Sequence, residues 1–210
     1  DGYGLRPNIG MRGTGVERSQ KINLMEDGVL ISPAPYSAPA AYYFPTIGRM
    51  EAFEIRKGSS QIKYGPYTTG GALNMISTKI PDQFHGRANL MAGSNSARTI
   101  HSSAGDSYKH FGFVAETYQA RVDGFKNLDG GGNTGFDKKD YMLKFRINSG
   151  RNSPVYQQLL VKIGQTKETS NETYLGLSDA DFDRTPYRRY AASREDVMRT
   201  DHKQYMVAYL

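Results

Sequence analysis

The sequence contains no cysteine and no tryptophan, and it has no long apolar segment. The absence of cysteine excludes disulfide bonds and thiolate sites. A mean hydropathy of -0.62 and a hydrophobic content of 38% exclude a protein that crosses a membrane with helices, because each such helix needs about 20 apolar residues in succession. These values do not exclude a membrane β-barrel, since its strands show only an alternation of apolar and polar residues.

The chain also lacks any concentrated block of charge, although its formal net charge is +6. The 27 Lys and Arg residues are scattered among 21 Asp and Glu residues, without a basic helix or an aromatic RNA-binding motif. We therefore expect no nucleic-acid partner. The 4 histidines fall at no metal-ligand spacing, and no nucleophile can be paired with a base. We expect a protein that is not an enzyme and that has neither a metal site nor a cofactor.

What the chain does have, in residues 1–81, is a series of glycine-centred turns between short apolar segments. Residues 24–31 have the pattern strand, Asp-Gly turn, strand, which predicts a β-hairpin. Residues 51–55 and 72–77 alternate polar and apolar side chains, as half-buried strands do. These features predict a small mixed domain built from hairpins.

After residue 81 the pattern changes to longer amphipathic segments. In residues 140–148, Tyr141, Leu143, Phe145 and Ile147 share one face, and polar side chains occupy most of the other. This is the pattern of a barrel wall that faces lipid outside and water inside. About six such strands are expected in antiparallel order. They are residues 84–93, 97–105, 110–122, 140–148, 156–166 and 202–210.

The connections between these strands also differ in length. The turns after the second and fourth strands are short, whereas the connections after the third and fifth are long, the longest being residues 167–201. Outer-membrane barrels have short turns on the periplasmic side and long loops outside the cell. The alternation therefore favours such a barrel, with the long connections at its extracellular end. The connection after the first strand, residues 94–96, would also be extracellular and yet is short, so length alone does not place it.

Three motifs at the start of the chain carry a resemblance to a known family. They are Asn8-Ile9-Gly10-Met11-Arg12-Gly13, Glu26-Asp27-Gly28-Val29 and the glycine-rich run at residues 55–79. Together they resemble the plug domain of TonB-dependent outer-membrane receptors. The fold class implied is mainly β: a small mixed α/β plug domain at 1–81, truncated at its start, and the first antiparallel strands of a transmembrane β-barrel at 82–210. We expect a fragment, because plugged transporters close with about 22 strands.

Two further segments resemble the ferric-citrate-type subgroup of these receptors. They are the long loop, at residues 171–182 and 186–193, and residues 34–39 of the plug. The resemblance implies uptake of ferric citrate or a related siderophore across the bacterial outer membrane, energised by TonB and its inner-membrane complex, with iron carried as cargo. Two alternatives remain open: another cargo, such as cobalamin or a different metallophore, and a soluble all-β carbohydrate-binding module.

An anionic chelate would be recognised by arginine, whose planar fork pairs with carboxylates, and by tyrosine. The long loop interleaves both residue types, and the plug loop at residues 33–45 combines tyrosines with prolines. The same residues are also compatible with a solvated loop and with packing against the barrel. The predicted ligand-binding residues are Tyr36, Tyr42, Tyr43, Arg188, Arg189 and Tyr190.

The resemblance also implies a set of charged residues that hold the plug to the barrel. Glu51, Glu54 and Lys57 align with two acidic positions and a basic one before the glycine-rich turn of the family. Lys57 departs from the commoner arginine, so that it keeps the charge and loses the bidentate fork. Together with Arg12, these residues are predicted to form plug–barrel ion pairs.

Overall fold

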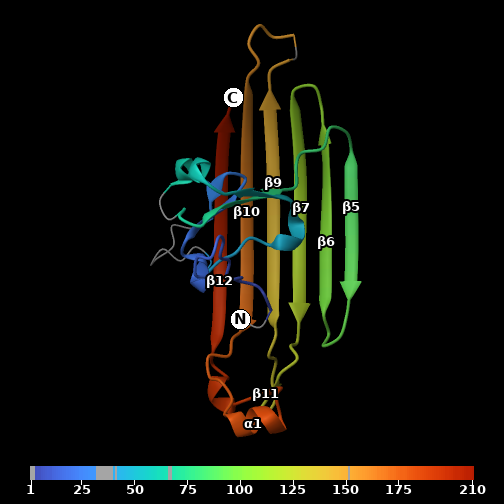
Figure 1. The fold of residues 1–210 in the computed structure, drawn as a ribbon. Coiled ribbons are helices and arrows are strands. Elements are labelled where there is room, and N and C mark those ends of the chain that lie inside the picture. The colour runs from blue at the N-terminus through green and yellow to red at the C-terminus, as the bar shows by residue number, and fades with distance from the viewer. Residues whose placement is uncertain (1–2, 32–39, 41, 66–67, 151) are drawn as a thin grey trace. The chain divides into compact units, whose positions relative to one another are not determined.

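A computed structural model describes residues 3–31, 40, 42–65, 68–150 and 152–210. The chain forms two compact units, one made of Gly4–Lys79 and the other of residues 80–210 with Tyr3 (Figure 1). We call them the first unit and the second unit and describe each by itself. Within the described residues, no helix has both the length and the apolar character needed to cross a membrane.

The first unit is built on a four-stranded sheet in the order β2-β1-β4-β3. Its strands are β1 (Ile22–Glu26), β2 (Val29–Leu30), β3 (Met50–Arg56) and β4 (Gly71–Ser77). The central pair, β1 and β4, is parallel, and the two outer pairs are antiparallel. Three short 3-10 helices connect the described parts: η1 (Glu17–Ser19), η3 (Ile47–Arg49) and η4 (Ser59–Tyr64).

The predicted hairpin is confirmed as β1 and β2. Asp27 and Gly28 form its turn with φ angles of 50° and 82°, as a type I′ turn requires. The strands predicted around residues 51–55 and 72–77 are also present, as β3 and β4. The expectation that residues 51–55 are half-buried was wrong, because β3 is an edge strand and its side chains are largely exposed.

The core of the first unit lies against the central pair of strands. Its buried residues are Ile22, Leu24, Ile31, Ala40, Tyr43, Phe44, Leu73 and Met75. Glu26 ends β1 inside this unit, and its Oε1 lies 2.7 Å from Nη1 of Arg49, which ends η3. The side chains of Glu26 and Arg49 are 0% and 3% exposed, so the apolar sheet carries a buried ion pair at one end.

The second unit is dominated by a six-stranded antiparallel sheet, which we call the wall sheet. Its strands follow one another in chain order as β5, β6, β7, β9, β10 and β12, and Figure 1 shows them side by side as long arrows that point in alternating directions. Their bounds are His85–Ala92, Arg98–Ser107, Phe111–Val122, Phe136–Asn148, Gln158–Asn171 and Val197–Tyr209. The six predicted wall strands are therefore all present.

The two faces of the wall sheet differ in polarity. Tyr141, Leu143, Phe145 and Ile147 of β9 lie on one face and are between 37% and 50% exposed. The register extends this face across the sheet: Phe145 is paired with Phe113 and Val161, and Val161 with Val207. The opposite face carries charged side chains such as Lys138 and Glu168, which form an ion pair of 3.2 Å. The predicted division of β9 into an apolar and a polar face is confirmed.

Three wall strands extend further toward the long loops than their apolar pattern predicts. β9 begins at Phe136, β10 continues to Asn171, and β12 begins at Val197. The added segments are rich in charge and lack apolar alternation, so the sequence pattern does not reveal them. Paired backbone groups extend these strands nonetheless, with Lys167 opposite both Lys139 and Asp201.

Candidate functional site

Two long loops lie at one end of the wall sheet, which we call the loop end. The first long loop, residues 123–135, connects β7 to β9, and the second, residues 172–196, connects β10 to β12. Because neighbouring strands are antiparallel, both loops leave the sheet in the same direction, and Figure 1 shows β11 and α1 beyond this end. The turns at residues 108–110 and 149–157 lie at the opposite end.

The two long loops are joined by a small parallel ribbon. Strand β8 (Asn127–Leu128) of the first loop pairs with β11 (Arg188–Arg189) of the second. The backbone N–H of Asn127 donates to the carbonyl of Tyr187 at 2.7 Å, and that of Asp129 donates to the carbonyl of Arg189 at 2.9 Å. The loops therefore form one structure, which sequence reasoning missed because two-residue strands far apart in the chain carry no periodic signal.

Arg188 fastens this ribbon with its side chain. Its Nε and Nη2 donate to the two carboxylate oxygens of Asp129 at 3.0 and 2.9 Å, which is the bidentate geometry that guanidinium favours. Its Nη1 donates to Asp181 at 3.1 Å, and its guanidinium lies 4.9 Å from the ring centre of Tyr190. The hydrogen bond with Asp129 is the main cause that raises the pKa of Arg188 above its ordinary value.

Arg189, its neighbour, points the other way and is only 1% exposed. Its Nε donates to the hydroxyl of Ser193 at 2.8 Å, its Nη2 to the carbonyl of Ser193, and its Nη1 to the carbonyl of Asn171 at 3.3 Å. These bonds tie the second long loop to the end of β10. Arg189 is therefore buried and supports the loop, whereas the side chain of Arg188 is about one-third exposed and accessible to solvent.

A short helix, α1 (Asp179–Arg184), carries the acidic partner of Arg188. Ser178 caps this helix, because its hydroxyl accepts the N–H of Asp181 at 3.3 Å. The hydroxyl of Tyr190 donates to the Asp181 carboxylate. This hydrogen bond, followed by those from Ser178 and Arg188, lowers the pKa of Asp181 below its ordinary value against the opposing effect of desolvation. Tyr190 therefore stabilises the loop fold.

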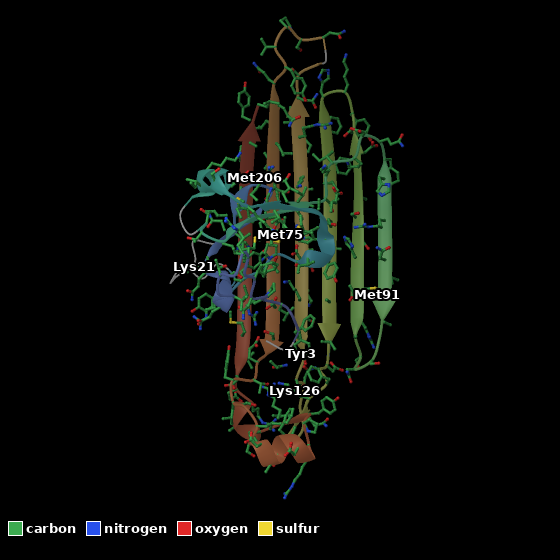
Figure 2. All side chains as sticks on the ribbon, in the orientation of Figure 1. Tyr3, Lys21, Met75, Met91, Lys126 and Met206 are labelled. Atoms are coloured by element: carbon green, nitrogen blue, oxygen red, sulfur yellow. The ribbon has the colours of Figure 1, made fainter. Side chains whose placement is uncertain are left out.

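The base of the loops is closed by Tyr3. Its hydroxyl donates to the carbonyl of Thr134 at 2.7 Å, and its ring lies 5.9 Å from Phe125 and 5.3 Å from Phe136. Figure 2 shows Tyr3 and Lys126 at this end of the wall sheet. A hollow of about 300 Å³ lies beside Tyr3, Lys126 and Thr134. Burial raises the pKa of the Tyr3 hydroxyl.

The tips of the loops remain open to solvent. Tyr174, Phe182 and Tyr187 are 76%, 60% and 59% exposed. Arg184 is also exposed, and its side chain forms no hydrogen bond or ion pair with the described residues. An exposed aromatic and cationic tip is suited to contact a planar or anionic ligand. The interleaving of tyrosine and arginine in the sequence is the signal that indicates this tip.

The predicted ligand-binding residues of the first unit have different positions. Tyr36 lies outside the described residues. Tyr42 is 48% exposed, whereas Tyr43 is 8% exposed and belongs to the apolar core. Of the two tyrosines described, Tyr42 is accessible to a ligand and Tyr43 has the position of a packing residue.

The charged residues predicted to link plug and barrel have contacts inside the first unit. Glu54 accepts a hydrogen bond of 3.0 Å from the side chain of Asn74, and Glu51 accepts one of 3.2 Å from the N–H of Lys79. Arg12 has a positive φ of 57°, and Lys57 is exposed. The plug–barrel ion pairs stay a prediction.

The sequence matches no protein-family model. Among solved structures, the ferric citrate transporter FecA in its unliganded form is similar with a TM-score of 0.70 and 22% identity, over 88% of this chain and 28% of that chain. The FrpB iron transporter from Neisseria meningitidis has a TM-score of 0.66 and 15% identity, over 98% of this chain and 34% of its own. The ferric yersiniabactin uptake receptor FyuA from Yersinia pestis has a TM-score of 0.63 and 16% identity, over 84% and 28%.

The chain has the fold of part of these transporters. It spans about a third or less of each one's length. The fold class is therefore confirmed as mainly β, with a small mixed unit followed by the first antiparallel strands of a barrel wall. Structures with this fold include transporters named for ferric citrate, iron and copper, so the fold does not select a cargo.

Proposed function

We propose that this chain is the plug and the first part of the barrel wall of a bacterial outer-membrane receptor that imports a ferric chelate. The observation that carries the proposal is the succession of a compact mixed unit and an antiparallel sheet with one apolar, exposed face. The similarity to metal transporters over most of the chain supports it.

The apolar face of the wall sheet supports a membrane location. Tyr205, Val207 and Tyr209 of β12 are 69%, 70% and 70% exposed, and their row neighbours on β10 and β9 are apolar as well. Soluble proteins rarely expose a continuous apolar patch of more than a few hundred Å². A lipid environment removes this cost, which disfavours the alternative of a soluble carbohydrate-binding module.

In this proposal the receptor performs no chemistry on its cargo. Ferric citrate or a related siderophore docks outside the cell, and TonB with its inner-membrane complex supplies the energy that releases it inward. Iron is carried as cargo and is not a resident cofactor. A different metallophore remains the alternative cargo, because transporters named for copper and for iron share the fold.

The loop geometry refines the proposed ligand contacts. Arg188, Tyr190 and Arg184 lie on the outer part of the second long loop, and Arg188 and Tyr190 are only partly buried. We assign direct contact to these three residues, together with Tyr42 and Tyr36 of the plug. Arg189 would act by holding the loop in place, because all of its bonds lie within the loop and the end of β10. Tyr43 would act by packing.

The experiment is a titration of the purified full-length receptor with ferric citrate at two ionic strengths. We expect Arg184→Ala to weaken binding while the barrel assembles normally, since the side chain is exposed and forms no hydrogen bond or ion pair with the residues that the structure describes. Added salt should weaken wild-type binding more than it weakens the variant, because exposed charges are screened.

Arg184→Lys is the matched control, because it keeps the charge and loses the planar fork. If Arg184→Ala binds ferric citrate as tightly as the wild type, the second long loop does not contact the chelate through this residue. If the wild-type receptor binds no ferric chelate but retains a copper chelate or cobalamin, the cargo proposal is wrong and the alternative holds.

A further inference from the structure

The apolar face of the wall sheet changes character near the loop end. The register places Arg98, Arg121, Asp137, Thr169 and Arg199 in one row across five strands. The adjacent row contains Lys139, Lys167 and Asp201 on β9, β10 and β12. The basic side chains outnumber the two carboxylates, and all of them stand on the same face as Phe145. We call the basic members of these two rows, with Lys203 of the third, the cationic belt: Arg98, Arg121, Lys139, Lys167, Arg199 and Lys203.

The centre of the cationic belt is a hollow of about 440 Å³ between β9, β10 and β12. Lys139, Lys167 and Arg199 line it, together with Asp137 and Asp201. This volume is large enough for a phosphate group, and cations from three strands converge on it. Arg and Lys are the side chains that bind phosphate most effectively in proteins.

The internal contacts of these three cations are weak or long, and they leave the cations exposed to a ligand. Nζ of Lys139 lies 3.8 Å from Asp137, and both side chains are nearly half exposed, so this pair is weak. The Asp201 carboxylate accepts a hydrogen bond of 2.9 Å from the amide of Gln165, and its charge also interacts with Lys167 and Lys203, although neither ammonium group lies within ion-pair distance of it. The side chains of Lys167 and Arg199 form no hydrogen bond or ion pair within the part of the chain that the structure describes.

The cationic belt is continuous with the apolar rows. Tyr141 follows Lys139 on the same face, and Leu143, Ile163 and Tyr205 form the row after that. At the opposite end of this face the row contains Phe111, Ile147, Leu159 and Tyr209, and it carries no charge. A partner for this surface must therefore be anionic at one end and apolar along the rest. That is the chemistry of a phosphorylated lipid, held by its headgroup at the loop end.

We propose that Lys139, Lys167 and Arg199 bind the phosphate groups of a lipid headgroup in the outer leaflet, while its acyl chains cover the apolar rows. This inference rests on the membrane location given under the proposed function. The charged segments that extend β9, β10 and β12 would then place the cations beyond the apolar rows, at the depth of the lipid headgroups. The backbone groups between these strands are already paired, so the surface offers side chains rather than an open strand edge to its partner.

The test uses the purified full-length receptor in neutral detergent with bisphosphorylated lipid A as the probe, and native mass spectrometry counts the retained lipid. The variant combines Lys139→Gln, Lys167→Gln and Arg199→Gln. Each cation near an anionic lipid surface contributes enough that the loss of three should weaken retention by about a hundredfold. The charge-conserving variant Lys139→Arg, Lys167→Arg and Arg199→Lys should retain lipid A like the wild type.

Two probe controls identify the source of the phosphate. Lipid A without its phosphates should be retained poorly by every variant, and inorganic phosphate should not displace bisphosphorylated lipid A at equal concentration. If the triple Gln variant retains lipid A as well as the wild type does, the proposal is wrong. If inorganic phosphate displaces lipid A efficiently, the ligand of this site is a free anion and the lipid proposal is wrong.

Assembly and cargo binding are measured on the same preparations, by heat-modifiable gel mobility and by titration with ferric citrate. Loss of lipid retention with unchanged ferric citrate affinity supports the lipid site separately from the transport function. Retention of lipid A by a receptor that binds no chelate overturns only the cargo proposal. If the triple variant does not assemble, Lys167→Gln alone should lower retention about fivefold, and an unchanged value would overturn the lipid site.

Discussion

In the first unit Ile22, Leu24 and Met75 are at most 1% exposed, whereas in the wall sheet Tyr205, Val207 and Tyr209 are about 70% exposed. Both sets of side chains stand on β-strands. β1 is buried along its whole length, and β12 exposes every second residue. The first unit therefore buries its apolar side chains within itself, while the wall sheet leaves the apolar side chains of one face exposed.

The difference teaches how each unit is stabilised. Burial of apolar area stabilises the first unit in water by about 25 cal/mol per Å². The wall sheet receives no such contribution from its exposed rows, unless lipid covers them as the proposed function requires. Substitutions inside the first unit and on the apolar face of the wall should therefore destabilise the protein for different reasons, and the following variants separate the two.

The largest effect is expected at the buried ion pair of the first unit. Arg49→Met removes the cation that lies 2.7 Å from the carboxylate of Glu26 in a site that is 0% exposed, and breaking a buried pair in this way costs about 3–5 kcal/mol. Urea unfolding of the first unit, followed by hydrogen exchange of β1 and β4, measures the loss. Arg49→Lys keeps the charge and should lose less. Equal stability of the methionine variant and the wild type would contradict the assigned pair.

The next effect concerns the apolar face of the wall. Phe145→Arg places a cation in the middle of the apolar rows, which costs about 2–4 kcal/mol if that row lies near the centre of a bilayer. Heat-modifiable gel mobility of the full-length protein, folded into lipid vesicles, measures the assembled fraction. Phe145→Leu, which preserves apolar character, should assemble normally. If both variants assemble equally well, this face does not meet lipid at that depth.

A smaller effect on the whole protein is expected in the long loops, because the change is confined to the loops and does not reach the wall sheet. Arg189→Ala removes a buried cation and its bonds to Ser193 and Asn171, and each bond from a charged donor contributes about 1.5–3 kcal/mol. Arg188→Ala, at a partly exposed position, should disturb the loops less. Protease cleavage rates in residues 172–196 compare the two. The order of the two variants would reverse if Arg188 were the main anchor.

The smallest effect follows from the lowered pKa of Asp181, whose ordinary value is 3.8. A carboxyl group whose pKa is lower in the folded state stabilises that state above the ordinary pKa. The contribution is lost as the pH falls through the lowered value, so the loop contacts should be unchanged at neutral pH and weaken only below about pH 4. Tyr190→Phe removes the main cause of the shift and should raise the pKa of Asp181, as an NMR titration of labelled aspartate would show. An unchanged pKa would contradict the hydrogen bond.

Sequence periodicity was sufficient for the parts of the fold that are amphipathic. Residues 140–148 alternate, and the Asp27-Gly28 turn has a known backbone preference, so the wall strands and the hairpin could both be predicted. Periodicity failed for β3, because exposure there depends on its place at the sheet edge. It also failed where charged segments extend the strands, since backbone pairing across the sheet, not side-chain pattern, sets their ends.

The residue types of the candidate site could be predicted from the sequence, but the positions and partners of its side chains could not. The mixture of tyrosine and arginine in the second long loop indicated a binding surface, but adjacent residues received different positions. Arg188 points to Asp129, which lies in the first long loop, and no local pattern reveals that partner. Arg189 alternates to the opposite side of β11 and is buried. Glu26 and Arg49 were missed because the two residues meet only when η3 packs beside β1.

The ribbon of β8 and β11 also sets an order of events during folding. Each wall hairpin can form from neighbouring segments, whereas Asn127 and Arg188 come from loops separated by the whole of β9 and β10. Closing a long loop lowers the entropy of the chain before any stabilising contact has formed, so pairings between distant segments form slowly. The ribbon should therefore form only after β9 and β10 have paired, so that it joins loops whose flanking strands are already in register. A factor that delays the pairing of β10 would then leave the two long loops unjoined while β5, β6 and β7 are already paired.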